Sequence, residues 1–170
     1  MHTLTELWNR AAEEHAQSVA AIDAGQQFTY SDLDRMIAGF AGALRRQLGV
    51  SPGDRVGLIM PNCVHSISCY LGTVRAGAIA LPVNIRLKAE EMAFILKDAG
   101  VRSLVVDRRV WPTVWEAVGE LEGVTHIIGI DVHQPTVMPL DEVYQHEPLR
   151  QSPPASADDV AAIIYTSGTT

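Results

Sequence analysis

The stretch RVGLIMPNCVHSISCYLGTVRAGAIALPV, residues 55–83, decides the predicted fold class. It begins with the short apolar run RVGLIM and ends with a second one, AIALPV, and both runs are typical of buried strands. Between them, residues 62–76 predict an apolar helix. A strand, a helix and a second strand in this order predict a right-handed βαβ unit with two parallel strands.

The same alternation continues downstream. Helices are predicted over residues 90–99 and 112–121, and strands at SLVVD (103–107) and VTHIIGI (124–130). Strands that alternate with helices of this length favour a parallel sheet with helices on both faces. We therefore predict an α/β fold.

The segment before this alternation is predicted to form two helices around a small β-hairpin. Thr3 and Glu6 have the spacing of a capping box, so the first helix should begin there. The stretch AIDAGQQFTY has two short β-like runs around Gly25, which predict the hairpin. Ser31 is predicted to open the second helix, which ends at Gly49.

Three parts are predicted along the chain. Residues 1–145 form an N-terminal α/β subdomain, residues 146–159 form a surface linker, and residues 160–170 form a strand and a loop. The linker, HEPLRQSPPASADD, is rich in proline and poor in apolar residues. The run VAAIIY that follows it predicts another buried strand.

The composition is that of an ordinary globular domain. The 170 residues are 47% apolar and 19% charged, with a formal net charge of −7. An acidic chain repels phosphate backbones and anionic lipids, so nucleic acids and membrane surfaces are not expected as partners. No apolar run reaches the ~18 residues of a membrane span, and the first residues lack the apolar region of a secretory signal.

The two cysteines, Cys63 and Cys69, indicate a reducing compartment, and we predict the cytoplasm. Six residues of helix place them on different faces and roughly 9 Å apart along the axis, beyond the reach of a disulfide. Both are predicted to be small buried side chains, with a paired or catalytic role as the alternative.

A run of small polar residues follows the last predicted strand. It consists of Thr166, Ser167, Gly168, Thr169 and Thr170. A glycine lets the backbone approach an anion, small residues can turn their N–H groups inward, and hydroxyls donate to phosphate oxygens. The run is therefore a candidate phosphate-binding loop, with a plain polar turn as the alternative. It is not a Walker loop, and the chain has no Gly-x-Gly-x-x-Gly motif.

The run IIYTSGTT, residues 163–170, resembles the start of the phosphate-binding loop of the adenylate-forming (ANL) superfamily, which includes the acyl-CoA synthetases. Three upstream blocks resemble the same family in the same order: FTYSDLDRMIAGFAGALRRQLGVSPGDRVGLIMPN, YLGTVRAGAIALPVNIRL and KAEEMAFILKDAGVRSLVVD. The resemblance covers nearly all of the chain from residue 3 to 170. It implies the N-terminal part of a longer enzyme, which ends inside a loop that the family continues with Gly-x-Pro-Lys-Gly.

Thr169 and Asn84 narrow the resemblance to acyl- and aryl-CoA synthetases, because peptide-synthetase domains usually carry Ser and Asp at these positions. The chain departs from the family at Ile85, where Pro is common, and at Lys88, where Thr or Ser often caps a helix with Glu91 as partner. Lys88 cannot accept that hydrogen bond, which leaves the start of the next helix open.

The resemblance implies an ATP-dependent carboxylate–CoA ligase. In such enzymes a carboxylic acid attacks the α-phosphorus of ATP to give acyl-AMP and pyrophosphate, and coenzyme A then forms a thioester. ATP, Mg²⁺ and coenzyme A are implied, with a small-molecule carboxylic acid as substrate. Residues 166–170 would belong to the loop that holds the β and γ phosphates. No catalytic residue or metal ligand is assigned within the chain. The resemblance implies that the loop lysine and the adenine pocket lie beyond residue 170, so the isolated 170 residues are expected to be inactive.

Arg86 is a further candidate. It follows the run AIALPV, at the carboxyl end of a predicted strand, where ligands meet open α/β sheets. It could contact a phosphate of coenzyme A; the alternative is a solvated loop arginine with a local partner.

The alternative function is a non-catalytic α/β binding or interaction module that keeps the fold and lacks the chemistry. Unpaired sheet edges near residues 160–165 further predict an exposed apolar surface and association into homo-oligomers. His126 and His133 have no third ligand nearby in the sequence, so no zinc site is predicted. Other conspicuous side chains are expected to pack structurally: His65, Trp8, Trp111 and Trp115.

Overall fold

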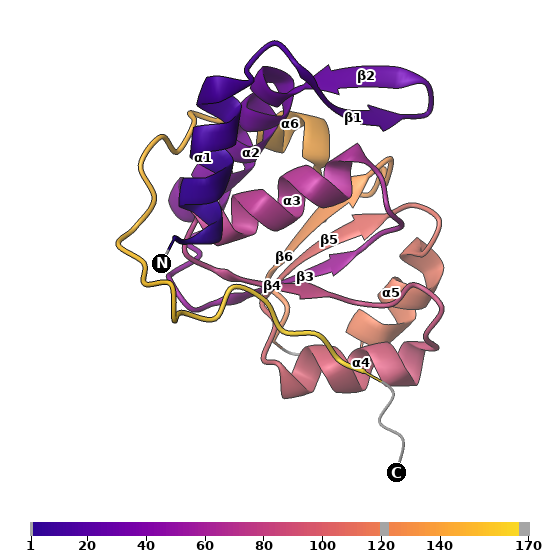
Figure 1. The fold of residues 1–170 in the computed structure, drawn as a ribbon. Coiled ribbons are helices and arrows are strands. Elements are labelled where there is room, and N and C mark those ends of the chain that lie inside the picture. The colour runs from indigo at the N-terminus through magenta and orange to yellow at the C-terminus, as the bar shows by residue number, and fades with distance from the viewer. Residues whose placement is uncertain (1, 120–122, 167–170) are drawn as a thin grey trace.

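A parallel five-stranded sheet forms the middle of the molecule, and helices cover both of its faces (Figure 1). The computed structural model describes residues 2–119 and 123–166. The predicted α/β class is confirmed. The strands of the sheet are β3 (Arg55–Ile59), β4 (Ile79–Pro82), β5 (Ser103–Asp107), β6 (His126–Ile130) and β7 (Met138–Pro139). The helices are α1 (Leu4–Glu14), α2 (Tyr30–Arg46), α3 (Val64–Arg75), α4 (Ala89–Asp98), α5 (Trp111–Val118) and α6 (Leu140–Tyr144).

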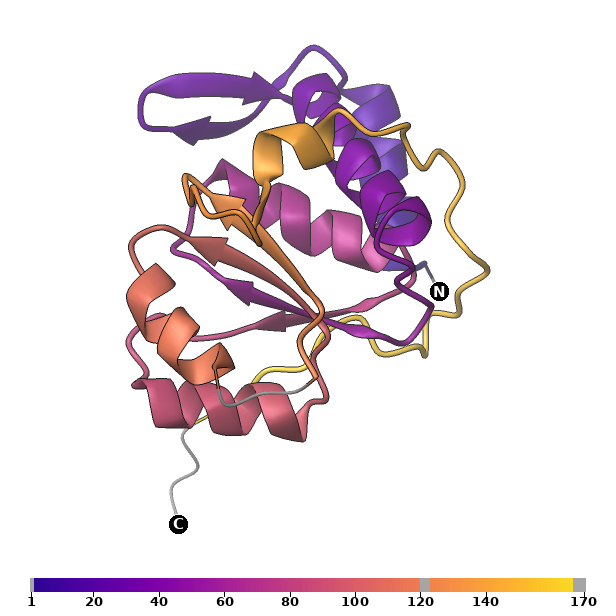
Figure 2. The same ribbon diagram turned by 180° about the vertical axis from the view of Figure 1, so that it is seen from behind.

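The order of the strands, β4-β3-β5-β6-β7, explains which face each helix covers. The chain leaves β3 in one direction to reach β4, and it then crosses back past β3 to reach β5. Because parallel crossovers are right-handed, this reversal places the connecting helices on opposite faces of the sheet. α3 lies on one face with α1, α2 and α6, and α4 and α5 lie on the other face (Figure 1 and Figure 2).

Two apolar clusters fill the spaces between the sheet and the helices. One includes Phe40 and Leu44 of α2, and the other includes Met92 and Leu96 of α4. All five residues of β5 are buried, since this strand lies inside the sheet and between both helix layers. Such two-sided burial accounts for the near-continuous apolar sequence of the strands.

The predicted hairpin consists of β1 (Val19–Asp23) and β2 (Gln26–Thr29), joined by a two-residue turn. Ala24 and Gly25 have positive φ angles of 48° and 83°, which suit a type I′ turn between twisted strands. The Oδ2 of Asp23 accepts a hydrogen bond of 2.9 Å from the backbone N–H of Val64, at the start of α3. A carboxylate at this end of a helix interacts favourably with the helix dipole.

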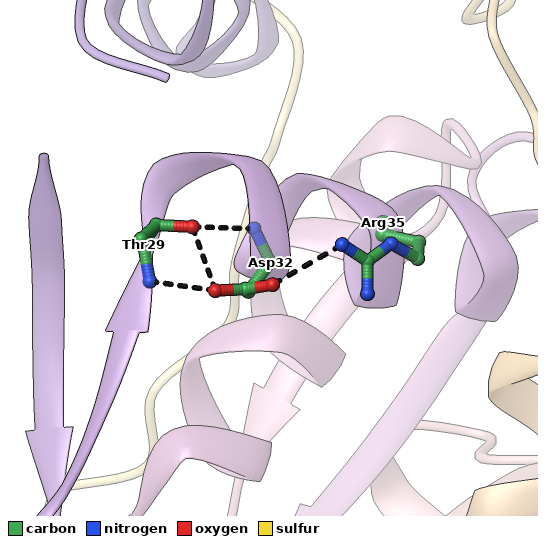
Figure 3. Close-up of polar contacts among 3 residues, drawn as sticks. All are labelled: Thr29, Asp32 and Arg35. Carbon is green, nitrogen blue, oxygen red and sulfur yellow. Dashed lines mark hydrogen bonds and ion pairs between the residues drawn. The ribbon is translucent and has the colours of Figure 1, made fainter. Parts of the chain in front are cut away.

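α2 begins earlier than predicted, because its N-cap is Thr29 and not Ser31. The hydroxyl of Thr29 accepts the N–H of Asp32 (3.1 Å), and the carboxylate of Asp32 accepts the N–H of Thr29 (3.0 Å; Figure 3). Asp32 also pairs with Arg35 at 3.1 Å. The hydrogen bonds from Thr29, with that of its side chain largest, lower the pKa of Asp32 from its ordinary value.

A buried arginine joins α1, α2 and α3. Arg75 is 5% exposed, and its Nη2 donates to Oδ1 of Asp34 on α2 (2.6 Å) and to Oδ1 of Asn9 on α1 (2.7 Å). Trp8 on α1 donates its indole N–H to the same Asp34 oxygen at 3.0 Å, which confirms Trp8 as a packing anchor. Because a buried guanidinium is costly without partners, this network fixes how α1 docks on the other two helices.

The segment with β7 and α6 is not predicted by the sequence. α6 lies so close to α2 that a Cβ added to Gly39 would collide with the backbone carbonyl of Tyr144. Just beyond α6, the N–H of Leu149 donates to the carbonyl of Ala38 at 2.9 Å. A two-residue strand and a five-residue helix are too short to show a hydrophobic period.

Two smaller expectations are settled by the structure. α4 begins at Ala89 despite Lys88, because the backbone N–H of Lys88 donates to Oε2 of Glu91 at 2.8 Å and so completes half of a capping box. The prediction that Trp115 is a packing anchor is wrong: Trp115 is 56% exposed. Its ring lies 5.4 Å from that of Trp111, which packs against the core in its place.

Removing the Thr29 hydroxyl should weaken the start of α2. We expect Thr29→Ala to lower the free energy of unfolding by about 1 kcal/mol in urea titrations at neutral pH, because the N–H of Asp32 loses its acceptor. Ser31→Ala is the matched control and should stay within about 0.5 kcal/mol of the wild type. Equal losses in the two variants would contradict the assignment of Thr29 as the cap.

The same pair of residues predicts a dependence on pH. The pKa of Asp32 is lowered in the folded state, so its contribution to stability is present above the unfolded value of about 3.9 and is lost as the pH falls through the folded pKa. In urea titrations below about pH 4, the difference in the free energy of unfolding between Thr29→Ala and the wild type should therefore become smaller. A difference that stays constant into stronger acid would argue against this coupling.

Candidate functional site

Two of the residues that the sequence indicates for ligand binding, Arg86 and Thr166, lie at one edge of the sheet. β3, β4 and β5 run parallel, so the loops after them all lie at the carboxyl edge. Ligands of open α/β sheets bind at this edge, next to the point where the strand order reverses. In this sheet the reversal occurs around β3, between β4 and β5.

The last described residues, 161–166, run beside β4. The N–H of Ala80 in β4 donates to the carbonyl of Ala161 (3.0 Å), and the carbonyl of Ala80 accepts the N–H of Ile163 (2.9 Å). These two hydrogen bonds form a parallel bridge between Ala80 and Ala162. Because the pairing is parallel, the segment and β4 both point toward the carboxyl edge.

The prediction of a buried strand over residues 160–165 is wrong. The pairing with β4 is a single isolated bridge, and Val160 and Ile164 are 59% and 70% exposed. β4 is the edge strand of the five-stranded sheet. Within the described ranges the segment therefore has a backbone neighbour on one side only, and two of its apolar side chains face solvent.

Side chains of the segment alternate between the core and solvent. Ile163 and Tyr165 pack against the apolar cluster under α4 and α5, whereas Ile164 and Thr166 are exposed. The hydroxyl of Tyr165 donates to Oδ2 of Asp98, the last residue of α4. This hydrogen bond, with the charge of Asp98, raises the pKa of Tyr165 from its ordinary value. Thr166 thus lies at the surface, directly after a residue that is held in place.

Thr166 is the one member of the predicted phosphate-binding loop that the structure describes. The other four, Ser167, Gly168, Thr169 and Thr170, lie outside the described residues. Among the five, the structure therefore positions the first.

Arg86 lies in the loop after β4 and is exposed. Its backbone N–H donates to Oδ1 of Asn84 at 3.0 Å, which closes a short turn. Across residues 2–119 and 123–166, its guanidinium forms no ion pair with a carboxylate. Since the last segment runs parallel to β4, Arg86 and Thr166 leave the sheet at the same edge.

A groove of about 690 Å³ lies between the loops after β3 and β4 and the first turns of α3. Its walls include the apolar side chains of Met60, Ile67 and Val83, and its polar groups include the amides of Asn62 and Asn84. Its volume is within the usual range of small-molecule sites. The sequence analysis did not identify this groove, although a polar residue soon after each of two neighbouring strands is a usable signal.

The loop after β5 carries a preorganised ion pair. Asp107 is 4% exposed, and its two carboxylate oxygens accept from Nε (2.8 Å) and Nη2 (2.9 Å) of Arg109. The side-chain hydrogen bond from Arg109 lowers the pKa of Asp107 and raises the pKa of Arg109. The arrangement holds a cation at the carboxyl edge, and the sequence analysis did not anticipate it.

The histidine and cysteines of the α3 segment have structural roles in the described chain. The hydroxyl oxygen of Tyr144 lies 2.6 Å from Oγ of Ser68 and 3.1 Å from Nδ1 of His65, whose ring stacks on that of Tyr144. Cys69 is fully buried, and this burial raises the pKa of its thiol to about 12, which makes it a poor nucleophile. Cys63 is half-buried at the N-cap of α3, so the prediction of burial holds for Cys69 alone.

Over the described ranges, 2–119 and 123–166, no group of three or more His, Cys, Asp or Glu side chains could hold a metal ion. Among the helices in these ranges, none has both the length and the hydrophobicity to cross a bilayer.

A family model for AMP-binding enzymes matches residues 8–170. The chain belongs to this family. The match confirms the resemblance to the adenylate-forming superfamily that the upstream blocks and the final loop indicate. The crotonobetaine/carnitine–CoA ligase of Salmonella paratyphi A is 34% identical over 178 residues, an alignment that covers 98% of this chain and 34% of that protein. The chain therefore spans about a third of the length of the curated relatives it matches.

Solved structures of AMP-binding enzymes share the fold. The crystal structure of the anthranilate CoA ligase AuaEII in complex with anthranoyl-AMP has a TM-score of 0.94 at 24% identity, over 99% of this chain and 33% of that one. A benzoate CoA ligase from Burkholderia xenovorans LB400 has a TM-score of 0.86 at 25% identity, over 95% of this chain and 32% of that one. The layers and strand order described above are thus the N-terminal architecture of these ligases.

Proposed function

We propose that this chain is the N-terminal part of an ATP-dependent carboxylate–CoA ligase. The observation that carries the proposal is the family match, which extends through the hydroxyl-rich run to Thr170. The relatives named above are CoA ligases, and the chain aligns with about a third of their length. The carboxyl-edge position of Thr166 supports the same reading, since this is where α/β sheets hold ligands.

The proposed reaction solves a problem of charge. A carboxylate is a poor electrophile, because its negative charge repels nucleophiles. In the first step a carboxylate oxygen attacks the α-phosphorus of ATP, and the bond from that phosphorus to the bridging oxygen of pyrophosphate breaks. In the second step the thiol of coenzyme A attacks the acyl carbon, and AMP leaves as the thioester forms.

Residues 166–170 are proposed to hold the β and γ phosphates during the first step. Their N–H groups and hydroxyls are donors that suit phosphate oxygens, and preorganised donors stabilise the charge that develops on departing pyrophosphate. ATP is expected to bind as its Mg²⁺ complex, and the proposal assigns no residue of this chain to the ion. The isolated 170 residues should not catalyse adenylation, because the remaining two thirds of the ligase architecture supply further substrate contacts.

Arg86 is proposed to contact a phosphate of coenzyme A. It is exposed at the same edge as Thr166, and within the described part of the chain no carboxylate neutralises it. A free guanidinium at the rim of a ligand site favours phosphate, with which it can form two hydrogen bonds. The small-molecule partner in the first step is a carboxylic acid.

Three further expectations remain part of the proposal. The division into residues 1–145, 146–159 and 160–170 is retained, with α6 closing the first part at Tyr144. The exposed apolar side chains Val160 and Ile164 favour association into homo-oligomers. Two free cysteines suit the cytoplasm.

The activity is tested by pyrophosphate exchange on the complete gene product. We expect radiolabelled pyrophosphate to enter ATP only when a suitable carboxylic acid is present, because exchange requires reversible formation of acyl-AMP. The 170-residue chain alone is the control and should show none. A folded, full-length protein that gives no exchange with a broad panel of acids, or a gene that stops at codon 170, would instead favour the non-catalytic binding module.

The role of Arg86 is tested in the thioester step. Arg86→Ala should raise the KM for coenzyme A by about tenfold, the loss expected for one charge-assisted contact, and leave pyrophosphate exchange unchanged. Arg86→Lys keeps the charge, and its KM for coenzyme A should lie between those of the wild type and Arg86→Ala. Arg35→Ala, which removes an exposed arginine on α2, is the control. An unchanged KM in Arg86→Ala would identify Arg86 as a solvated loop residue.

A further inference from the structure

The segment that leads into the hydroxyl-rich run is held by a contact with a residue far away in the sequence. Tyr165 and Asp98 are 67 residues apart, and the hydroxyl of Tyr165 donates to the carboxylate of Asp98. Two other contacts hold the same segment: the bridge to Ala80 and the packing of Ile163 on the apolar cluster. The contact to Asp98 is the one that lies closest in sequence to Thr166.

The position of Asp98 is not explained by the stability of its own helix. Asp98 is the last residue of α4, where the helix dipole places partial negative charge and a carboxylate is disfavoured. Lys97, its neighbour in the last turn, has the charge that this position favours. The hydrogen bond from Tyr165 gives Asp98 a function that the helix alone does not require.

The aromatic ring of Tyr165 does not need its hydroxyl to pack. The ring contacts the cluster under α4 and α5, and a phenylalanine would fill the same space. The hydroxyl adds a directional hydrogen bond, which fixes the orientation of the ring relative to the end of α4. Consecutive Cα atoms are about 3.8 Å apart, so fixing Tyr165 also limits where Thr166 can lie.

We propose that the hydrogen bond between Tyr165 and Asp98 is a positioning contact for the phosphate-binding loop. It ties the residue before Thr166 to the last residue of α4 before ATP arrives. An anchored loop start loses less conformational entropy on binding than a free one, so the contact favours binding of the triphosphate. The inference rests on the proposed function, because it assigns the run after Tyr165 to ATP.

The test uses the complete gene product and measures pyrophosphate exchange at varied ATP and varied carboxylic acid. Tyr165→Phe keeps the ring and removes the donor, and it should raise the KM for ATP about fivefold, as expected for one lost hydrogen bond. The KM for the acid should stay within twofold. The thermal midpoint should also be unchanged, because the contact is at the surface and the packing is retained.

Variants at Asp98 separate positioning from helix stability. Asp98→Ala should match Tyr165→Phe in its effect on the KM for ATP, and the double variant should be no worse than either single variant. Asp98→Asn keeps an acceptor oxygen and should recover most of the loss. Glu90→Ala, which removes an exposed carboxylate from the first turn of the same helix, is the matched control and should behave as the wild type.

The outcomes distinguish this inference from the function on which it rests. If the wild type exchanges pyrophosphate and Tyr165→Phe and Asp98→Ala keep its KM for ATP, the positioning role is overturned and the ligase assignment stands. If both variants lower the thermal midpoint and raise the KM for the acid and for ATP alike, the contact is a general structural one and the inference also fails. If the folded wild type shows no exchange, the proposed function and this inference fail together.

Discussion

The pairing of β3 with β4 on one side and with β5 on the other is the constraint on which the rest of the structure depends. As a result, β4 lies on one side of β3, and β5, β6 and β7 follow on the other side. Right-handed crossovers then require helices on both faces, and the strands become buried from both sides. The apolar composition of the strands and the two separate core clusters follow from this arrangement. It also gathers the loops after three neighbouring strands at a single edge.

That edge combines rigid and exposed groups. At this edge the buried carboxylate of Asp107 fixes Arg109, and the amide of Asn84 closes the turn that carries Arg86. Tyr165 is held from the other end of α4, where its hydroxyl donates to Asp98. In each case a short-range or packed contact orients a residue whose neighbour faces solvent. A scaffold of this kind suits the proposed ligase chemistry, because charged substrates must be oriented by groups that are already in place.

The sequence predicted the parts of the fold that have a strong local signal. The βαβ alternation predicted the parallel sheet, and the capping box at Thr3 predicted the start of the first helix. Both signals are local, because the hydrophobic period and the capping hydrogen bonds involve residues only a few positions apart. The last segment was predicted as a buried strand from VAAIIY, but burial depends on neighbours that a local pattern does not reveal, and Ile164 is exposed. α6 and the contact of Tyr165 with Asp98 also escaped prediction, since both depend on residues brought together by the tertiary fold. The assignment of residues 166–170 to a phosphate-binding loop stays a prediction: their composition left it as one of two alternatives, and the resemblance to a family favoured it.

The cap that Asp23 provides for α3 links the outermost part of the molecule to the edge that carries the groove. Cys63 offers no side-chain acceptor at the start of α3, so the N–H of Val64 depends on a carboxylate 41 residues away, on the hairpin. Deuterium can replace the amide proton of Val64 only when the hairpin lifts away or the first helical turn frays. Its exchange rate would thus report the population of an opened state in which the wall of the groove formed by α3 loosens. A peripheral β-ribbon would in this way set the rigidity of the groove wall that α3 forms.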